Sequence, residues 1–255
     1  MEQASLVLLE KQGAVASITL ARASKLNALS APMRAEIGAC LSEVACDESV
    51  KVVLLRAEGR SFCAGGDLAN APTDAMAWRD RVILAQAHHL QMIGMNKPII
   101  AAVQGVAAGG GASLALAADI LVMAEDARLS FPFVRLGLVP DGLCSALLQA
   151  KVGAGVALDI LLSGDSIDAG QAQRLGLTRR VVPNDALDQH ARNLAAELAA
   201  LPWEGLALTK SLCAQHWAAG LKQVGRQEAD AFALATTTIG HQQALASMLA
   251  KLNKN

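Results

Sequence analysis

A run of three glycines, Gly109-Gly110-Gly111, is the feature that most constrains the fold of this chain. It follows an apolar run at 98–103, typical of a buried strand, and precedes an apolar segment at 114–118, typical of a buried helix. Glycines in this position leave backbone N–H groups bare at the positive end of a helix, where an anionic oxygen binds well. The same glycines could instead serve only the close packing of a helix on a sheet.

A second glycine turn, Gly65-Gly66, also follows a predicted buried strand, at 50–55. Repeated strand–turn–helix units indicate parallel strands connected by helical crossovers. Each turn could direct one backbone N–H into a common cleft, and two such donors form an oxyanion hole, which stabilises negative charge on a carbonyl oxygen. Neither turn has the pattern of a phosphate loop or of a dinucleotide-binding fingerprint.

The remaining pattern predicts an α/β chain whose last part is helical. Strands at 6–10 and 14–20 surround a turn as a hairpin, and Ser30 is placed to cap a helix that ends near Cys46. Asp67 is expected to cap a short helix or to fix its turn, and a surface loop is expected at 70–74. Further strands are predicted at 119–124, 128–130 and 180–182, and further helices at 78–95, 143–151, 155–162, 168–175 and from 185 onward, with breaks near Pro202 and Gly220.

The composition excludes several classes of function. The 255 residues are 53% hydrophobic with a formal net charge of −1, which gives no attraction to nucleic acid or to an acidic membrane surface. The 5 cysteines have no CxxC spacing, so we expect reduced thiols in a cytoplasmic protein without a metal site. No apolar run reaches the roughly 18 residues that span a membrane. His88 and His89 form the one histidine cluster, and neighbours on a helix are expected to point apart.

Two longer segments carry a resemblance to a known family: SFCAGGDL at 61–68 and GVAAGGG at 105–111. Both resemble signatures of the crotonase, or enoyl-CoA hydratase/isomerase, superfamily, and 25–29 and 136–140 resemble its other landmarks. The resemblance implies an α/β, crotonase-like ββα-spiral core with the acyl-CoA site over residues 1–200, and an all-helical trimerisation region over residues 201–255. It also implies a homotrimer or a hexamer, an acyl-CoA substrate, no metal, and no cofactor other than the coenzyme A of the substrate.

Carried over by position, the resemblance assigns the oxyanion donors to the N–H groups of Gly66 and Gly110. Ala64 and Leu68 would hold the adenine and pantetheine portion of the substrate, and Lys25 would lie near the nucleotide. A lysine beside anionic phosphates suits that role, although Lys25 could also be an ordinary solvated residue. The full set expected to bind substrate is Lys25, Ala28, Ala64, Gly65, Gly66, Asp67, Leu68, Gly110 and Phe133.

The acid/base residues decide which reaction such a site performs. Hydratases of the superfamily carry two glutamates, at positions that here hold Ser113 and Phe133. Without these carboxylates no group is placed to activate water, so an efficient hydratase is rejected. Asp141 remains as a well-placed carboxylate, and the enoyl-CoA isomerases of the superfamily resemble the chain here because they carry Asp or Glu at this position.

A single carboxylate suffices to move a double bond. Asp141 would remove a proton from the α carbon of a 3-enoyl-CoA, the oxyanion hole would hold the dienolate, and the same carboxyl would return a proton at the γ carbon. Apolar neighbours would raise its pKa and exclude water. Asp141 could instead only cap the helix expected near Leu143.

Other interpretations stay open. Dehalogenases of the superfamily use an Asp at this position as a nucleophile, but they pair it with a Trp where this chain has Phe133 and with a His where it has Gln86. A weak hydratase, a racemase, a thioester hydrolase or a catalytically silent acyl-CoA-binding paralogue are further alternatives. Trp203, Trp217 and Phe232 are expected in packing or trimer contacts, and Phe232 is also a candidate to border the site.

Overall fold

The structure is a computed structural model that describes residues 5–68 and 71–252. Its main sheet has six strands in the order β1-β2-β3-β4-β6-β9. β1 and β2 pair antiparallel as the predicted hairpin, and the other neighbouring pairs are parallel, as the strand–helix alternation predicted. The strands are β1 (Val7–Gln12), β2 (Val15–Leu20), β3 (Val52–Ala57), β4 (Ile99–Val103), β6 (Ile120–Ala124) and β9 (Arg180–Val182).

A second sheet of three short strands lies beside the glycine run. Its order is β5-β7-β8, with β5 (Val106–Ala108), β7 (Arg128–Ser130) and β8 (Ser166–Asp168). Of these three strands only β7 was predicted, because β5 and β8 are defined by their pairing with β7, a contact between distant parts of the chain. The pairing of β5 with β7 matters for the site, since Gly109 N–H donates to Ser130 O at 2.9 Å and the turn is thereby fixed.

Local signals explain where several helices begin. The Ser30 side chain accepts from Met33 N–H at the start of α1 (Ala31–Cys46), as predicted. α2 (Ala75–Gly94) begins before residue 78 because Asp74 caps it. Of the loop predicted at 70–74, Asn70 lies outside the described residues. α3 (Gly110–Leu116) begins at Gly110, not at residue 114 as predicted, so the glycine run opens the helix instead of preceding it.

The later helices follow the predicted order, with breaks at Pro202 and Gly220. Asp168 caps α6 in a capping box: its Oδ1 accepts from Gln171 N–H, and its own N–H donates to Oε1 of Gln171. The remaining helices are α4 (Cys144–Val152), α5 (Ala154–Ser163), α6 (Ala169–Arg174), α7 (Leu187–Ala199), α8 (Trp203–Ala218), α9 (Leu221–Thr236) and α10 (Ile239–Leu252), with short 3₁₀ turns η1 (Ala23–Lys25), η2 (Val134–Leu136) and η3 (Asn184–Ala186).

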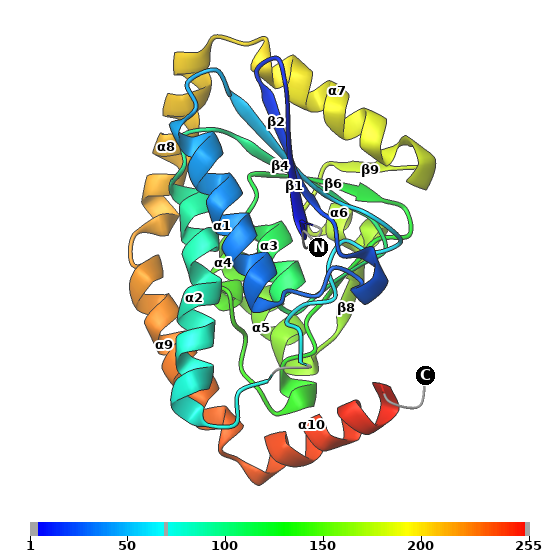
Figure 1. The fold of residues 1–255 in the computed structure, drawn as a ribbon, viewed down its shortest axis with the longest axis vertical. Coiled ribbons are helices and arrows are strands. Elements are labelled where there is room, and N and C mark those ends of the chain that lie inside the picture. The colour runs from blue at the N-terminus through cyan, green and yellow to red at the C-terminus, as the bar shows by residue number, and fades with distance from the viewer. Residues whose placement is uncertain (1–4, 69–70, 253–255) are drawn as a thin grey trace.

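Helices enclose the main sheet and bring the C-terminal segment back to the core. α7 packs on β3, β4 and β6, while α1 lies against β1 and β2. α9 runs alongside α2 over much of its length, and α10 crosses the lower end of the molecule and contacts η2 (Figure 1). The core is formed by fully buried side chains of the strands and of α1, such as Ile18, Leu54, Ile99 and Ile37.

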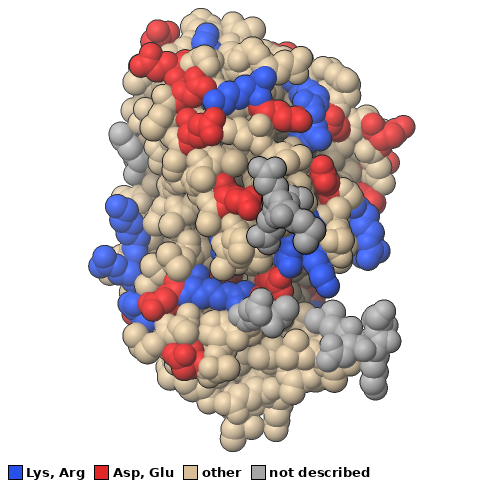
Figure 2. Space-filling view, in the orientation of Figure 1, with Lys and Arg blue, Asp and Glu red and all other residues tan. Residues whose placement is uncertain are grey.

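The surface shown in Figure 2 has no area of a single charge. Acidic and basic side chains are interspersed over its upper part, and the lower end is largely uncharged. In the described part of the chain, no helix is both long and apolar enough to cross a membrane.

Candidate active site

The two glycine turns meet at the carboxyl ends of the adjacent parallel strands β3 and β4, an edge where α/β proteins commonly bind ligands. Backbone hydrogen bonds join the turns: Cys63 N–H donates to Val106 O at 3.1 Å, and Ala108 N–H donates to Cys63 O at 2.9 Å. Gly65 has φ +94°, and a β carbon added there would lie 2.6 Å from Ala108 O. The contact between the turns therefore requires glycine at this position.

The N–H groups of Gly66 and Gly110 are available to a ligand. Gly110 is the first residue of α3, and the first N–H groups of a helix have no partner within it. Among the hydrogen bonds of the described residues, neither of these N–H groups is a donor. A β carbon built on Gly66 would lie 3.8 Å from Nη2 of Arg34, and one built on Gly110 would lie 3.9 Å from the same atom. Both donors therefore border one small volume, as an oxyanion hole requires.

Asp141 faces this volume from the turn before α4. Its Oδ1 is buried, lacks a hydrogen-bond partner among the described residues, and lies 3.9 Å from a β carbon built on Gly110. Burial raises the pKa of the Asp141 carboxyl, and the positive charges of Arg34 and Arg81 oppose that shift. Gly66, Gly110 and Asp141 line one cavity of about 120 Å³ together with the buried side chain of Phe133. A buried carboxyl that lies between apolar side chains and two arginines, beside two N–H donors, is chemically able to exchange a proton with a bound thioester.

Asp141 does not cap α4, so the capping interpretation is wrong. α4 begins at Cys144 after Leu143, which has a left-handed φ of 64°, and no side chain of the N-cap residue bonds the helix. A different carboxylate satisfies this end: Glu228 of α9 accepts from Leu143 N–H at 2.8 Å and from Ser145 N–H at 3.1 Å. Burial raises the pKa of Glu228 to about 7. The C-terminal segment thus holds the turn that carries Asp141.

Ser113 fixes the same turn from the other side. Its hydroxyl, fully buried in α3, donates to Asp141 O at 2.9 Å. Gly142 has φ +66°, and a β carbon there would lie 2.9 Å from Cβ of Ser113 and 3.2 Å from Cε1 of His89. The Ser113 hydroxyl therefore ties α3 to the backbone of Asp141, and Gly142 has no room for a larger residue.

Arg34 and Arg81 are site residues that the sequence reasoning missed. Arg34 projects from α1, and its buried Nε has no hydrogen-bond partner in the described part of the chain. Arg81 projects from α2, donates from Nη2 to Asp67 O at 2.5 Å, and lies 5.1 Å from the centre of the Trp78 ring. A signal was present, because each arginine falls at helical spacing with core residues: Arg34 with Ile37 and Leu41, and Arg81 with Trp78 and Ala85.

His88 and His89 do not point apart as predicted. Their ring centres are 4.4 Å apart and both side chains are buried, because α2 is covered by α1 and by α9. Burial lowers the pKa of both imidazoles, that of His89 to about 4, so they are neutral near pH 7. No cluster of three His, Cys, Asp or Glu residues suited to a metal ion occurs in the described ranges.

The structure collects most of the predicted substrate-binding residues and leaves three outside the cavity. Asp67 lines a neighbouring hollow and forms an ion pair of 2.6 Å with Arg22, and among the described residues that follow it no helix begins before Ala75, so Asp67 does not cap one. Lys25 is exposed at the end of η1, and Ala28 O accepts from Arg22. The cavity is lined by the predicted residues Ala64, Gly65, Gly66, Leu68, Gly110, Phe133 and Asp141.

The C-terminal segment also reaches the cavity. Phe232 of α9 lines it and packs on Trp78, with ring centres 5.4 Å apart, and Met248 of α10 lines it as well. Gln86 donates to Glu228 at 3.3 Å, so this side chain supports α9 and does not face a substrate. Trp203 begins α8 away from the cavity, and the side chain of Trp217 lies outside the described residues.

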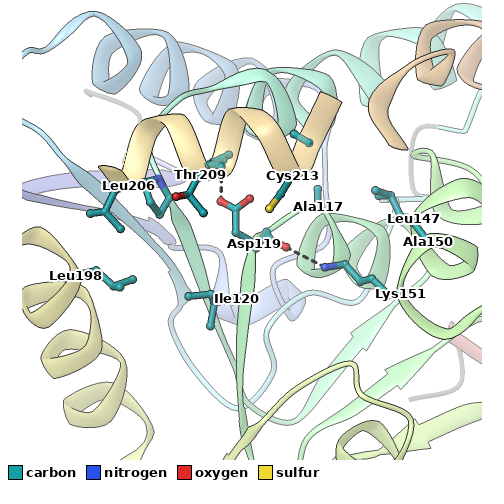
Figure 3. Close-up of a pocket in the computed structure, with 14 residues that line it drawn as sticks. Ala117, Asp119, Ile120, Leu147, Ala150, Lys151, Leu198, Leu206, Thr209 and Cys213 are labelled. Carbon is teal, nitrogen blue, oxygen red and sulfur yellow. Dashed lines mark hydrogen bonds and ion pairs between the residues drawn. The ribbon is translucent and has the colours of Figure 1, made fainter. Parts of the chain in front are cut away.

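A larger hollow of about 450 Å³ lies beneath α8, with Asp119 inside it and Lys151 at its edge (Figure 3). Its charges are engaged by the protein. Asp119 Oδ2 accepts from Ile99 N–H at 2.7 Å and pairs with Lys210 at 2.8 Å, and Lys151 donates to Ala118 O at 3.2 Å. Among the described residues that line this hollow, no buried side-chain nitrogen or oxygen atom lacks a hydrogen-bond partner, and neither glycine turn enters it.

The six-stranded sheet, the small second sheet, the helical C-terminal segment and the paired glycine turns define the chain as an α/β protein of the crotonase superfamily. The family model described as Enoyl-CoA hydratase/isomerase matches residues 10–253, and the chain belongs to this family of acyl-CoA enzymes. The chain is 34% identical over 209 residues, 80% of each chain, to the 1,2-epoxyphenylacetyl-CoA isomerase of Escherichia coli K12.

Solved structures agree on the fold and carry both activity names. An enoyl-CoA hydratase from Mycobacterium avium subsp. paratuberculosis matches with a TM-score of 0.88 and 26% identity, over 96% of this chain and 100% of that chain. A monofunctional enoyl CoA isomerase from M. smegmatis matches with a TM-score of 0.71 and 30% identity, over 88% and 98%. The family is therefore established, and the reaction has to be argued from the site.

Proposed function

We propose that this enzyme is an enoyl-CoA isomerase, which moves a double bond from the 3 to the 2 position of an acyl-CoA. The observation that carries the proposal is Asp141 Oδ1, a buried carboxylate oxygen without a partner among the described residues, at the edge of the volume bordered by Gly66 and Gly110. A carboxylate oxygen accepts at its lone pairs, and none of those on Asp141 Oδ1 is engaged by a donor among the described residues.

The geometry suits each step of the reaction. With the thioester oxygen between the N–H groups of Gly66 and Gly110, the α carbon lies on the side of Asp141. Asp141 takes the α proton, the two N–H donors stabilise the dienolate, and the protonated Asp141 returns a proton to the γ carbon. Burial favours the protonated carboxyl between these two transfers, because the raised pKa of Asp141 brings its proton affinity closer to that of the reacting carbons.

Hydration is disfavoured by the residues at the two positions where hydratases of the family carry glutamate. Ser113 is fully buried and its hydroxyl is held by the main chain of Asp141, while Phe133 presents a ring to the cavity. Neither can activate a water molecule as a base. The names of the E. coli and M. smegmatis relatives, both isomerases, support the proposal, and the M. avium hydratase marks the alternative.

The proposal also covers where the nucleotide end of coenzyme A binds and which oligomer the chain forms. We expect the nucleotide end of coenzyme A near the exposed Lys25 and near Ala28, outside the cavity. We also expect a homotrimer or a hexamer through the C-terminal helices, and no cofactor beyond the coenzyme A of the substrate.

The test is a panel of 3-enoyl-CoA and 2-enoyl-CoA thioesters of increasing chain length, assayed side by side for isomerisation and for hydration by chromatography of the products. The proposal expects isomerisation of the preferred 3-enoyl-CoA to exceed hydration of the matching 2-enoyl-CoA by roughly a hundredfold or more, the typical contribution of one acid/base group. Hydration at an equal or higher rate, or no turnover of any thioester, would contradict it.

A further inference from the structure

The cavity at the glycine turns contains two arginines that the proposed proton transfer does not use. Its charged lining residues are Arg34, Arg81 and Asp141, so two guanidinium groups face one carboxyl. We infer that the acyl group of the substrate carries a carboxylate of its own, which Arg34 and Arg81 bind. This inference rests on the proposed function, because it concerns the acyl group of the same acyl-CoA substrate.

Of the two arginines, Arg34 gives the stronger argument for a bound anion. A guanidinium stays charged at every pH at which a protein folds, so a buried arginine needs an anion or hydrogen-bond acceptors. Burial lowers the pKa of Arg34, which shows that its surroundings disfavour the charge. Its Nε is buried without an acceptor, and no ion pair among the described residues joins Arg34 to Asp141. The arginine is therefore placed to receive an acceptor from a ligand.

Arg81 adds a second donor on the facing helix. A β carbon built on Gly66 would lie 3.5 Å from Nη2 of Arg81 and 3.8 Å from Nη2 of Arg34, so the two guanidinium groups border the same turn. Arg81 is held by Asp67 O and by the ring of Trp78, which fix its direction. Two arginines from two helices can grip a planar carboxylate through charge-assisted hydrogen bonds.

The position of the arginines distinguishes the acyl group from the coenzyme A phosphates as the source of the anion. Nη2 of Arg34 lies beside Gly66 and Gly110, where the thioester oxygen is proposed to bind. The phosphates of coenzyme A are separated from the thioester by the whole pantetheine arm. Of these two sources, the acyl group is the one whose carboxylate can reach Arg34.

There is room for a chain that extends past the reacting carbons. Arg34 and Arg81 also border a second hollow of about 540 Å³ between α1 and α2, which Pro32 and Leu84 line with apolar surface. Asp67 borders it too, but this carboxylate is already paired with Arg22. The guanidinium groups thus stand between the site of proton transfer and this hollow, where the far end of a short dicarboxylic acyl chain would come to lie.

The test compares the binding of saturated acyl-CoA pairs of equal chain length: butanoyl- with succinyl-CoA, hexanoyl- with adipyl-CoA, and octanoyl- with suberyl-CoA. Saturated thioesters have no double bond to move, so titration calorimetry measures recognition apart from the reaction. At least one acidic member should bind roughly ten- to a hundredfold more tightly than its neutral partner, the range expected for a hydrogen bond to a charged group. Equal or weaker binding of every acidic member would overturn the inference without any variant.

Variants locate the preference. Arg34→Met should remove most of it, Arg34→Lys should keep part of it, and Arg81→Met should reduce it. Arg79→Met is the matched control, because Arg79 lies on the same helix as Arg81 and pairs with Asp230 outside the cavity. It should leave the preference unchanged. If Arg34→Met weakens acidic and neutral members equally, the arginine supports the thioester oxygen instead and the inference is wrong.

The inference and the proposed function can fail separately. Selective binding of the acidic thioesters together with no isomerisation of the corresponding 3-enoyl-CoA would overturn the isomerase proposal alone. Isomerisation that is fastest with neutral chains, together with equal binding of the saturated pairs, would overturn the acidic substrate alone.

Discussion

Two regions of this molecule bury charged side chains, and they differ in whether the described buried polar atoms all have hydrogen-bond partners. Beneath α8, Lys210 pairs with Asp119 and also donates to Met92 O and to Lys97 O, both at 2.9 Å. Around the glycine turns, by contrast, Arg34 Nε and Asp141 Oδ1 are buried without a hydrogen-bond partner among the described residues. In the described part of the chain, every buried side-chain nitrogen or oxygen atom without a hydrogen-bond partner belongs to Arg34, His88, His89 or Asp141.

The contrast indicates which hollow is built for chemistry. A buried polar atom without a partner costs stability, so a folded protein keeps few of them. The hollow beneath α8 is the larger of the two, but its charges are used by the fold. The smaller cavity keeps unused hydrogen-bonding groups around two free N–H donors, and these groups are available to a substrate. Unsatisfied groups therefore identify the site better than cavity volume does.

The largest effect is expected from Asp141→Asn. The amide cannot accept the α proton, so isomerisation should fall by about a hundred- to ten-thousandfold while binding of a saturated acyl-CoA is kept. Steady-state rates and calorimetry measure the two effects separately. Asp159→Asn, an exposed change on α5, is the control and should leave the rate unchanged. A rate of Asp141→Asn near that of the wild type would show that Asp141 is not the base, and the cavity at the glycine turns would no longer be distinguished from the hollow beneath α8 by its chemistry.

Glu228 should make stability depend on pH. Its carboxyl has a pKa of about 7 in the folded protein and an ordinary value of 4.5, so the folded state holds its proton more tightly. The free energy of unfolding should therefore fall as pH rises from about 4.5 to about 7. Relative to Glu228→Gln, which cannot lose a proton, the wild type should lose about 3 kcal/mol over that window. Denaturant unfolding at several pH values measures it, and parallel curves would show that burial does not shift this carboxyl.

A smaller effect is expected in the fully partnered region. Lys210→Met removes the cation of the ion pair and leaves the partly exposed Asp119 and two carbonyls without their donor. The free energy of unfolding should drop by about 2 kcal/mol, less than for a fully buried pair because water reaches Asp119. The rate per folded enzyme should stay unchanged. A loss of rate without a loss of stability would show that this hollow takes part in the reaction.

Local sequence signals were enough for most of the fold. The hairpin of β1 and β2, the Ser30 cap of α1, and the breaks at Pro202 and Gly220 were all predicted, because each depends on turn or capping residues within a few positions. β5 and β8 were missed since their three-residue strands are defined by pairing with β7, a contact that is not local. The early start of α3 at Gly110 has the same origin, because tertiary packing overrides the low helix propensity of glycine.

The site divides in a similar way. The glycine turns and Asp141 were found from motifs, and the structure brings them to one cavity. Arg34, Arg81 and Glu228 were missed because their roles depend on how α1, α2 and α9 pack together. Each nevertheless lies at helical spacing among core residues, so a charged residue on a buried stripe was the available signal.

The central claim is that one buried carboxyl carries a proton from the α to the γ carbon, and isotope transfer tests it most directly. A 3-enoyl-CoA with deuterium at both α positions is isomerised in ordinary water, and the γ carbon of the 2-enoyl product is examined by mass spectrometry and deuterium NMR. Because the cavity shields Asp141 Oδ1 from solvent, the account predicts that a measurable fraction of the product carries deuterium at the γ carbon. Product with protium alone at that carbon, at every stage of the reaction, would contradict it.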